Sequence, residues 1–253
     1  QYRFDRLPKA KGKAAEPLLS FPSGALVHFA VSNSEVWMVT RLAGSATVFL
    51  PFNQGDHGAA GNPMNPKGGH RTAYLWEQVW ARESWLEILG RYMIAQRDKK
   101  KQIEKIIFPR FHQLDVTRKL QSAVLEQETG GPGGKYLVQH SAGSGKTNSI
   151  AWTAHFLAEL HDSEHKKVFD SVLVISDRNV IDSQLQEALF DFQRKTGVVA
   201  TIKGSDGSKS KELAAALSGD KKIVVCTIQT FPFAMEAVQK LTATQGKRFA
   251  VIA

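Results

Sequence analysis

Residues 136–152 read Tyr-Leu-Val-Gln-His-Ser-Ala-Gly-Ser-Gly-Lys-Thr-Asn-Ser-Ile-Ala-Trp. This order is typical of a β-strand, a glycine-rich turn and the first turns of a helix. Glycines at positions 143 and 145 allow backbone N–H groups to wrap around a polyphosphate, and a helix that begins near Lys146 adds the positive end of its dipole. The stretch therefore predicts a phosphate-binding P-loop at residues 140–147.

Two side chains of this loop carry the predicted chemistry and are the candidate catalytic residues. The Lys146 ammonium would reach the β and γ phosphates of ATP, and the Thr147 hydroxyl would ligate Mg²⁺, which makes ATP and Mg²⁺ the predicted cofactors. The other reading, a chance glycine-rich surface loop, is disfavoured by the flanking strand and helix patterns. The predicted ATP-binding residues of the loop are His140, Ser141, Ala142, Gly143, Ser144, Gly145, Lys146 and Thr147.

Strand and helix patterns alternate along the chain from residue 106 onward. Strands separated by helix-length segments pair in parallel through right-handed crossovers, so the pattern predicts a doubly wound α/β sheet. The expected strands are residues 135–139, 171–176, 198–202, 222–227 and 248–253. The expected helices are residues 111–127, a segment from 146 onward, 179–194, 209–218 and 229–240.

The residues before 106 follow a different pattern. Three short β-type runs between residues 25 and 50, with turn residues between them, predict a β-meander. Residues 51–71 are rich in Gly, Asn and Pro and are expected to form a long loop. Apolar residues then recur at helical spacing from 75 to 93, and the helix is expected to end in the basic run at residues 97–101.

Composition narrows the classes of protein that this chain can be. Its formal charge of +9 suits a protein that meets phosphate backbones, although charge alone is weak evidence. No apolar stretch is long enough for a membrane helix, so no membrane partner is expected. Cys226, the single cysteine, is expected to be a buried structural thiol, which favours a cytoplasmic location. The histidines show no zinc-site spacing.

Several further motifs carry a resemblance to a known family. The commonest form of the P-loop opens with Gly, and His140 holds that position here. Helicase-type motors of superfamily 2 often open with Ala or another residue while keeping Gly-x-Gly-Lys-Thr, so the pattern resembles theirs. The chain resembles the motor (R) subunit of type I restriction endonucleases across nearly its whole length. The segments that look like that subunit are residues 107–118 (similar to its Gln motif), 172–184 (motif Ia), 225–231 (the next motif), 35–42 and 49–53.

The resemblance implies that residues 106–253 form a RecA-like first motor lobe. This lobe would be truncated before the Walker B motif, the pair of carboxylates that holds Mg²⁺ and the attacking water. A helical connector at residues 71–105 and the C-terminal part of an α+β nuclease-type domain at residues 1–70 would precede it. The nuclease residues are expected before Gln1, since residues 1–105 show no such constellation. The second motor lobe is expected after Ala253, and residues 1–253 by themselves are expected to be inactive.

The implied activity is ATP-driven translocation on double-stranded DNA, coupled to endonucleolytic cleavage. The implied partners are that DNA and the methylation and specificity subunits of a restriction complex. Two alternatives stay open. The chain could belong to a stand-alone superfamily 2 helicase or remodeller without a nuclease, or it could be a non-catalytic ATP-binding assembly module.

The resemblance also assigns residues outside the P-loop. Gln113 would read the adenine edge by donating and accepting through its amide; the alternative is a solvent-exposed Gln on a helix face. Arg178 would contact a DNA phosphate, or it would form an ion pair with Asp177 or Asp182. The remaining DNA-contact candidates are Thr227, Gln229 and Thr230, which could instead cap the following helix.

Overall fold

The computed structural model describes residues 2–9, 12, 14–127, 133–176, 179–193, 197–202, 209–230, 232 and 246–253. The chain forms two compact units, Gln1–Asp115 and Val116–Ala253, which are described separately below. In the described part of the chain, no helix is long and apolar enough to cross a membrane.

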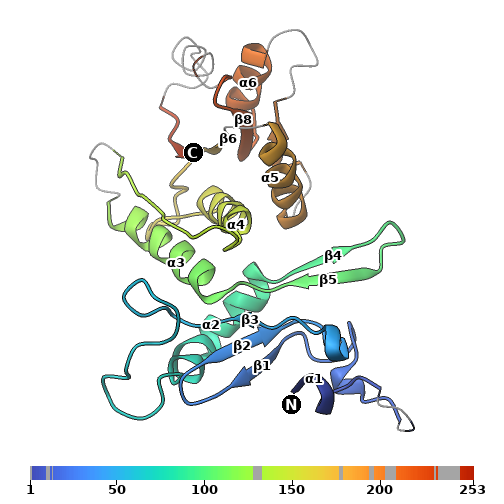
Figure 1. The fold of residues 1–253 in the computed structure, drawn as a ribbon. Helices are drawn as coiled ribbons and strands as arrows, with labels where there is room; N and C mark the ends of the chain where they lie inside the picture. The colour runs from blue at the N-terminus through green and yellow to red at the C-terminus, as the bar shows by residue number, and fades with distance from the viewer. Residues whose placement is uncertain are drawn as a thin grey trace. The chain divides into compact units, whose positions relative to one another are not determined.

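The first unit holds the expected β-meander, drawn in blue in Figure 1. Strands β1 (His28–Val31), β2 (Val36–Val39) and β3 (Leu50–Pro51) pair antiparallel in that order. The third strand is shorter and lies later than expected, because Gly44–Ala46 forms a 3-10 turn instead. Two further short helical segments precede the sheet, α1 (Tyr2–Asp5) and Pro17–Leu19.

The long loop at residues 51–71 is irregular, as expected, and polar contacts hold it in place. The Asn62 amide donates to the Ser34 carbonyl and to Asn53 Oδ1, and its oxygen accepts the backbone N–H of Gln54. Asn62 is only 2% exposed, so these bonds satisfy a polar group that would otherwise be buried at a cost. The loop is therefore ordered by side-chain bonds in place of a β-ladder.

The segment after this loop departs from the sequence prediction in two ways. The expected single helix is divided into π-helical Leu75–Val79, α2 (Arg82–Glu87) and π-helical Ile88–Tyr92. The basic run is not a helix end. It forms the turn of an antiparallel hairpin made of β4 (Ile94–Arg97) and β5 (Ile103–Ile107). Lys101 adopts a left-handed φ of 62°, which closes this turn.

His28 gives the first unit a testable pH dependence. The residue is 7% exposed in β1, and desolvation lowers the pKa of its imidazole below the ordinary 6.5. The unfolded chain therefore binds a proton near pH 6.5 that the folded chain resists, so the free energy of unfolding falls as the pH drops below 6.5. Urea titrations of His28→Leu should show a weaker fall. In His57→Asn, which removes an exposed imidazole, the fall should persist.

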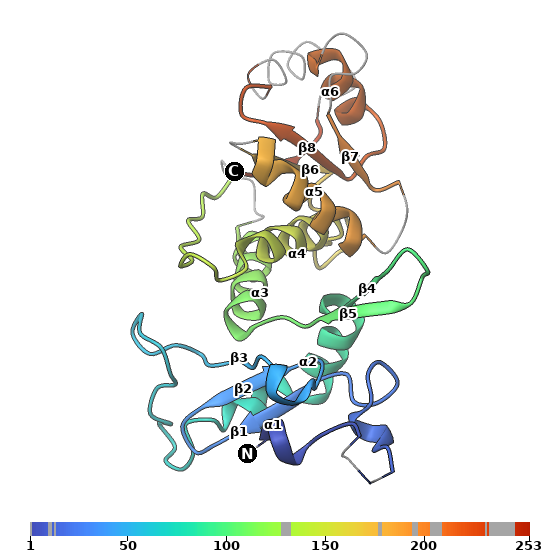
Figure 2. The ribbon, with the colours of Figure 1, turned by 45° about the vertical axis from the view of Figure 1, so that its right-hand side comes forward.

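The second unit is built on a four-stranded parallel sheet with the order β7-β8-β6-β9. Strands β6, β7 and β8 are labelled in Figure 2. Every pairing is parallel, as the alternation of strands and helices predicted. The strands are β6 (Ser171–Ser176), β7 (Val199–Thr201), β8 (Ile223–Thr227) and β9 (Phe249–Ile252). The helices are the end of α3 (Phe111–Glu126), α4 (Lys146–Ala158), α5 (Asn179–Phe192) and α6 (Lys209–Ser218).

Helices cover both faces of the two central strands. Leu213 and Leu217 of α6 pack with Leu173, Val224 and the buried Cys226 on one face. Because neighbouring strand residues point to opposite faces, the alternate residues of β6 and β8 face the other side, where α4 and α5 contact the sheet. All five residues of β8 are buried as a result. This two-sided cover is the doubly wound arrangement that the sequence predicted.

Two of the elements expected from the sequence are not among these strands and helices. Residues 135–139 were predicted to be a strand, but they join no ladder, and Leu137 is 94% exposed. The local apolar pattern is present, but a strand also needs a partner backbone. Among the strands that the structure describes, β9 pairs with β6 and with no other. The helix expected at residues 229–240 lies almost entirely outside the described residues.

Candidate nucleotide-binding site

The P-loop leads directly into α4, as the sequence predicted. Lys146 is the first residue of this helix, and Gly145 precedes it with a left-handed φ of 83°. Gly143 has a φ of 70°, a conformation that residues with a side chain rarely adopt. The two glycines thus supply the tight turn that brings the loop backbone to the helix N-terminus.

Lys146 lies against the backbone of its own loop. Its Nζ donates to the carbonyl oxygens of His140 and Ser141 at 3.3 and 3.2 Å. Desolvation and then the positive charge of Lys146 lower the pKa of the His140 imidazole. His140 is therefore neutral at neutral pH, and Lys146 carries the positive charge at the mouth of the loop.

The loop offers the donors that a polyphosphate with Mg²⁺ requires. The first N–H groups of a helix have no acceptor within it, so those of Lys146 and Thr147 can be donated to a ligand. An added Cβ at Gly143 would meet no atom within 4 Å, so there is open space over the loop. Thr147 is half-buried in the first turn and adds a hydroxyl of the kind that ligates Mg²⁺. These groups fit ATP with Mg²⁺.

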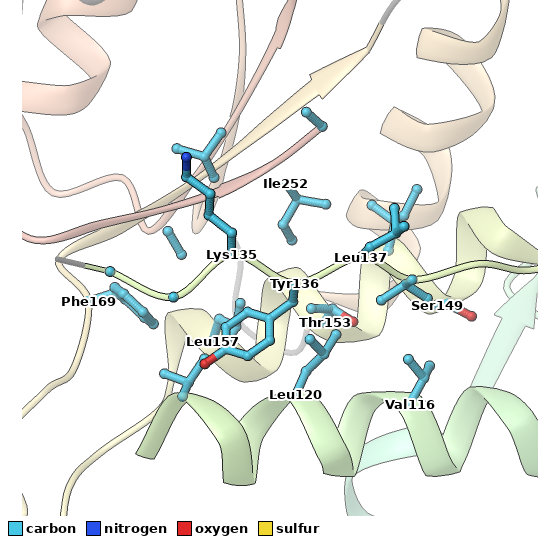
Figure 3. Close-up of a pocket in the computed structure, with 18 of the residues that line it drawn as sticks. Val116, Leu120, Lys135, Tyr136, Leu137, Ser149, Thr153, Leu157, Phe169 and Ile252 are labelled. Carbon is cyan, nitrogen blue, oxygen red and sulfur yellow. The ribbon is translucent and has the colours of Figure 1, made fainter. Parts of the chain in front are cut away.

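A cavity of about 1080 Å³ adjoins the loop (Figure 3). Val116 and Leu120 of α3 lie on one side of it, and Ser149, Thr153 and Leu157 of α4 on another. Residues 133–138, Phe169, Arg248 and β9 also line it. His140 and Lys146 also line it, so the loop opens onto this space.

Ser149 is a cavity residue that the sequence analysis did not single out. Its side chain is 6% exposed, and its Oγ has no hydrogen-bond partner in the described part of the chain. A buried unpaired hydroxyl is uncommon, since it costs about 1–3 kcal/mol. The sequence offers one feature that could have pointed to Ser149, namely a serine two residues after the lysine-threonine pair. This feature does not distinguish a serine that faces a cavity from one that faces solvent.

Gln113 is not the solvent-exposed residue of the alternative reading. It is 2% exposed, and its Oε1 accepts the backbone N–H of Arg110 at 2.8 Å. The Gln113 N–H donates back to the Arg110 carbonyl at 3.0 Å. The bond from the Arg110 N–H to the Gln113 side chain is the half of a capping box that the third helical residue supplies, and it caps the start of α3. The adenine role stays a prediction, and it would need the amide nitrogen and the second lone pair of the oxygen.

The cap and the predicted adenine contact of Gln113 can both be tested by substitution. In Gln113→Glu the acceptor for Arg110 remains but the amide donor is lost, so the preference for ATP over GTP should fall. Stability should fall as well, because a carboxylate replaces the amide at a position that is 2% exposed. In Gln113→Ala the preference should fall too, and stability should fall by about 1 kcal/mol because the cap is lost. Competition binding and urea unfolding would measure both. Equal losses of ATP and GTP affinity in Gln113→Glu would argue against an adenine contact.

The DNA-contact candidates fall into three groups. Thr227 and Thr230 are buried, and their hydroxyls bond to each other at 3.0 Å; the phosphate contact and the helix cap both stay predictions. Gln229 lies between them and is exposed, so it keeps its side chain available to a ligand. Arg178, with its possible partner Asp177, lies outside the described residues.

Comparison with known proteins adds one finding. A family model described as SWI2/SNF2 ATPase matches residues 112–253, which is more than half of the chain. The matched stretch contains the P-loop and the whole parallel sheet. No curated protein and no solved structure matches the chain.

Proposed function

The chain belongs to the SWI2/SNF2 ATPase family, and on this premise we propose that residues 140–147 bind ATP with Mg²⁺ for a DNA-translocating motor. The observation that carries the proposal is the position of Lys146, at the first residue of α4 and directly after left-handed Gly145. ATP would supply the phosphoanhydride bond whose hydrolysis drives the motor.

Each residue of the loop has a distinct part in holding the nucleotide. The N–H groups of the first helical turn would wrap the phosphates, and the Lys146 ammonium would neutralise their charge. The Thr147 hydroxyl would hold Mg²⁺. Lys146 would have to exchange the carbonyls of His140 and Ser141 for phosphate oxygens. The exchange is favoured because an anionic phosphate attracts the ammonium charge more strongly than a neutral carbonyl does.

We further propose that the parent protein is the R subunit of a type I restriction enzyme. The motifs at residues 107–118, 172–184 and 225–231 support this, as does the similarity of residues 35–42 and 49–53 to that subunit. DNA translocation would then be coupled to cleavage. The partners would be double-stranded DNA and the methylation and specificity subunits. A remnant of the nuclease domain would lie in the first unit.

A motor without a nuclease is the second candidate, because the family match begins only at residue 112. In the described part of the chain, no group of His, Cys, Asp and Glu could hold a metal ion. Purification of the parent protein from its own cells would separate the candidates. Methylation and specificity subunits should copurify under the first proposal and be missing under the second.

Calorimetric titration tests the nucleotide site itself. The 253-residue chain should bind ATP in the presence of Mg²⁺ and lose affinity when EDTA removes the metal. Inorganic triphosphate should compete, since the loop contacts phosphate groups. If ATP bound with the same affinity with and without Mg²⁺, the assignment of Thr147 as a metal ligand would fail.

A further inference from the structure

The cavity beside the P-loop is larger than the phosphate-binding loop requires. It lies within the second unit, because every residue that lines it belongs to residues 116–253. Its volume of about 1080 Å³ is that of a site for an organic molecule, since ligand pockets measure roughly 300–1,000 Å³. Of its lining residues, only His140 and Lys146 belong to the P-loop. Most of the cavity therefore has no part in the proposed ATP site.

The walls of the cavity are mainly apolar. Positions 116, 120 and 124 are four residues apart and lie along one face of α3. The side chains there are Val116, Leu120 and Val124, and all three are half-buried, so this face of the helix is incompletely covered. Leu157 of α4 and Phe249 of β9 add further apolar surface. A ligand with an apolar body would remove this surface from water, which favours its binding.

Ser149 places one unpaired polar group in this apolar lining. The residue is 6% exposed, and its Oγ has no hydrogen-bond partner in the described part of the chain. Leaving such a hydroxyl unpaired is costly, so a ligand atom that bonds to it would recover the lost hydrogen bond. The cavity thus favours a ligand whose apolar body carries a hydrogen-bonding group.

The charged side chains that line the cavity are all cationic, namely Lys135, Lys146 and Arg248. Two of them are engaged: Lys146 donates to loop carbonyls, and the Arg248 guanidinium lies 6.0 Å from the centre of the Phe169 ring. Lys135 is exposed, and its ammonium has neither a hydrogen bond nor an ion pair with any residue that the structure describes. Its charge favours a ligand with an anionic group over a neutral or cationic one.

The segment that carries Lys135 is held against α3. The next side chain, Tyr136, points toward that helix (Figure 3), and its hydroxyl donates to the Ala123 carbonyl at 3.0 Å. This bond keeps the extended residues 133–138 beside the apolar face of α3. The Lys135 charge is thus held at the border of the apolar space, where the anionic end of a ligand would stay in contact with water.

We propose that the cavity binds an amphipathic organic anion, with an aromatic body, one buried hydrogen-bonding group and one carboxylate or sulfonate. The body would lie against α3, the buried group would bond to the Ser149 hydroxyl, and the anionic group would face Lys135. This site goes beyond the proposed ATP site. The nucleoside of ATP is the rival occupant, and it fits less well because apolar walls cannot satisfy the hydroxyls of its ribose.

Two fluorescent probes that differ by one sulfonate test the proposal. 8-Anilinonaphthalene-1-sulfonate and N-phenyl-1-naphthylamine share an aromatic body with one N–H, and only the first is charged. Each should bind the chain at a single saturable site. Lys135→Gln should weaken the binding of the sulfonate by about two- to fivefold and leave that of the neutral probe unchanged. Lys211→Gln, which removes an exposed lysine of α6, is the matched control and should alter neither.

Two further variants test the place of the probes. Ser149→Ala removes the unpaired hydroxyl and should weaken both probes by about two- to tenfold, since each loses one hydrogen bond. Leu120→Phe adds volume on the α3 side of the cavity and should also weaken both. If the larger ring prevented folding, Ser149→Ala would still decide the question, because it removes a single atom.

Four outcomes would overturn the proposal. Equal effects of Lys135→Gln on both probes would mean that the cavity has no preference for an anion. Unchanged binding of both probes in Ser149→Ala, or in folded Leu120→Phe, would place them elsewhere. Displacement of both probes by ATP but not by inorganic triphosphate would assign the cavity to the nucleoside. Displacement of the sulfonate by triphosphate would assign the anion to the P-loop. Because triphosphate addresses the P-loop alone, failure of the ATP site and failure of this cavity are distinguishable.

Discussion

Lys146→Ala is expected to weaken the binding of ATP with Mg²⁺ by about a hundredfold or more. The ammonium would make charge-assisted bonds to two phosphates, each worth about 1.5–3 kcal/mol, and about 3 kcal/mol corresponds to more than a hundredfold in affinity. In the structure this ammonium donates to two loop carbonyls, and the residue is exposed. The fold should therefore survive the change, and calorimetric titration would measure the lost affinity.

Lys211→Ala is the matched control for this variant. Lys211 is an exposed lysine of α6 in the same compact unit, and its loss removes the same charge. ATP affinity should stay within about twofold of the unchanged chain, as expected for a surface substitution worth less than ~0.5 kcal/mol. Equal affinity for all three proteins would show that the loop at residues 140–147 holds no phosphate.

Trp152→Ala is expected to destabilise the second unit by about 3–5 kcal/mol. Trp152 is 1% exposed in α4, and its ring packs on Phe192 of α5 with centroids 5.1 Å apart. Alanine would leave a cavity between the two helices that cover one face of the sheet. Trp152→Phe keeps an aromatic ring there, so its loss should be clearly smaller.

Urea unfolding would measure this effect through a lower midpoint with an unchanged slope. Trp76→Ala serves as the control, because Trp76 is 43% exposed and its removal should cost less than about 1 kcal/mol. The chain has two compact units, so the affected transition should be followed with a probe in residues 116–253. A loss below 1 kcal/mol for Trp152→Ala would contradict the packing between α4 and α5.

Regular elements with strong local signals were predictable from sequence. Helix α6 spans Lys209–Ser218, the same residues that helical spacing indicated, and β6 spans the expected Ser171–Ser176. The P-loop turn was also predictable, because Gly143 and Gly145 adopt the left-handed conformations that glycine allows. These features depend on neighbours within a few residues.

Pairing partners were much less predictable. The sequence predicts a helix end at the basic run of residues 97–101, yet this run forms the turn of a hairpin, because β4 and β5 pair with each other on either side of it. Residues 135–139 have a strand pattern but remain outside every ladder. Short apolar runs suit either a helix or a strand, so contacts elsewhere in the fold decide between the outcomes.

The sequence by itself determined the phosphate-binding loop, the alternation that gives a parallel sheet and the burial of Cys226. Each of these follows from residue types at short spacing, which fix local backbone conformation and the periodic apolar face. Only the tertiary structure decided that Gln113 is buried, that Ser149 borders a cavity and that the ammonium groups of Lys167, Lys222 and Lys247 lie close enough to repel one another. Each of these features depends on contacts between residues of separate helices and strands. The spacing of residues along the sequence does not specify which helices and strands pack together.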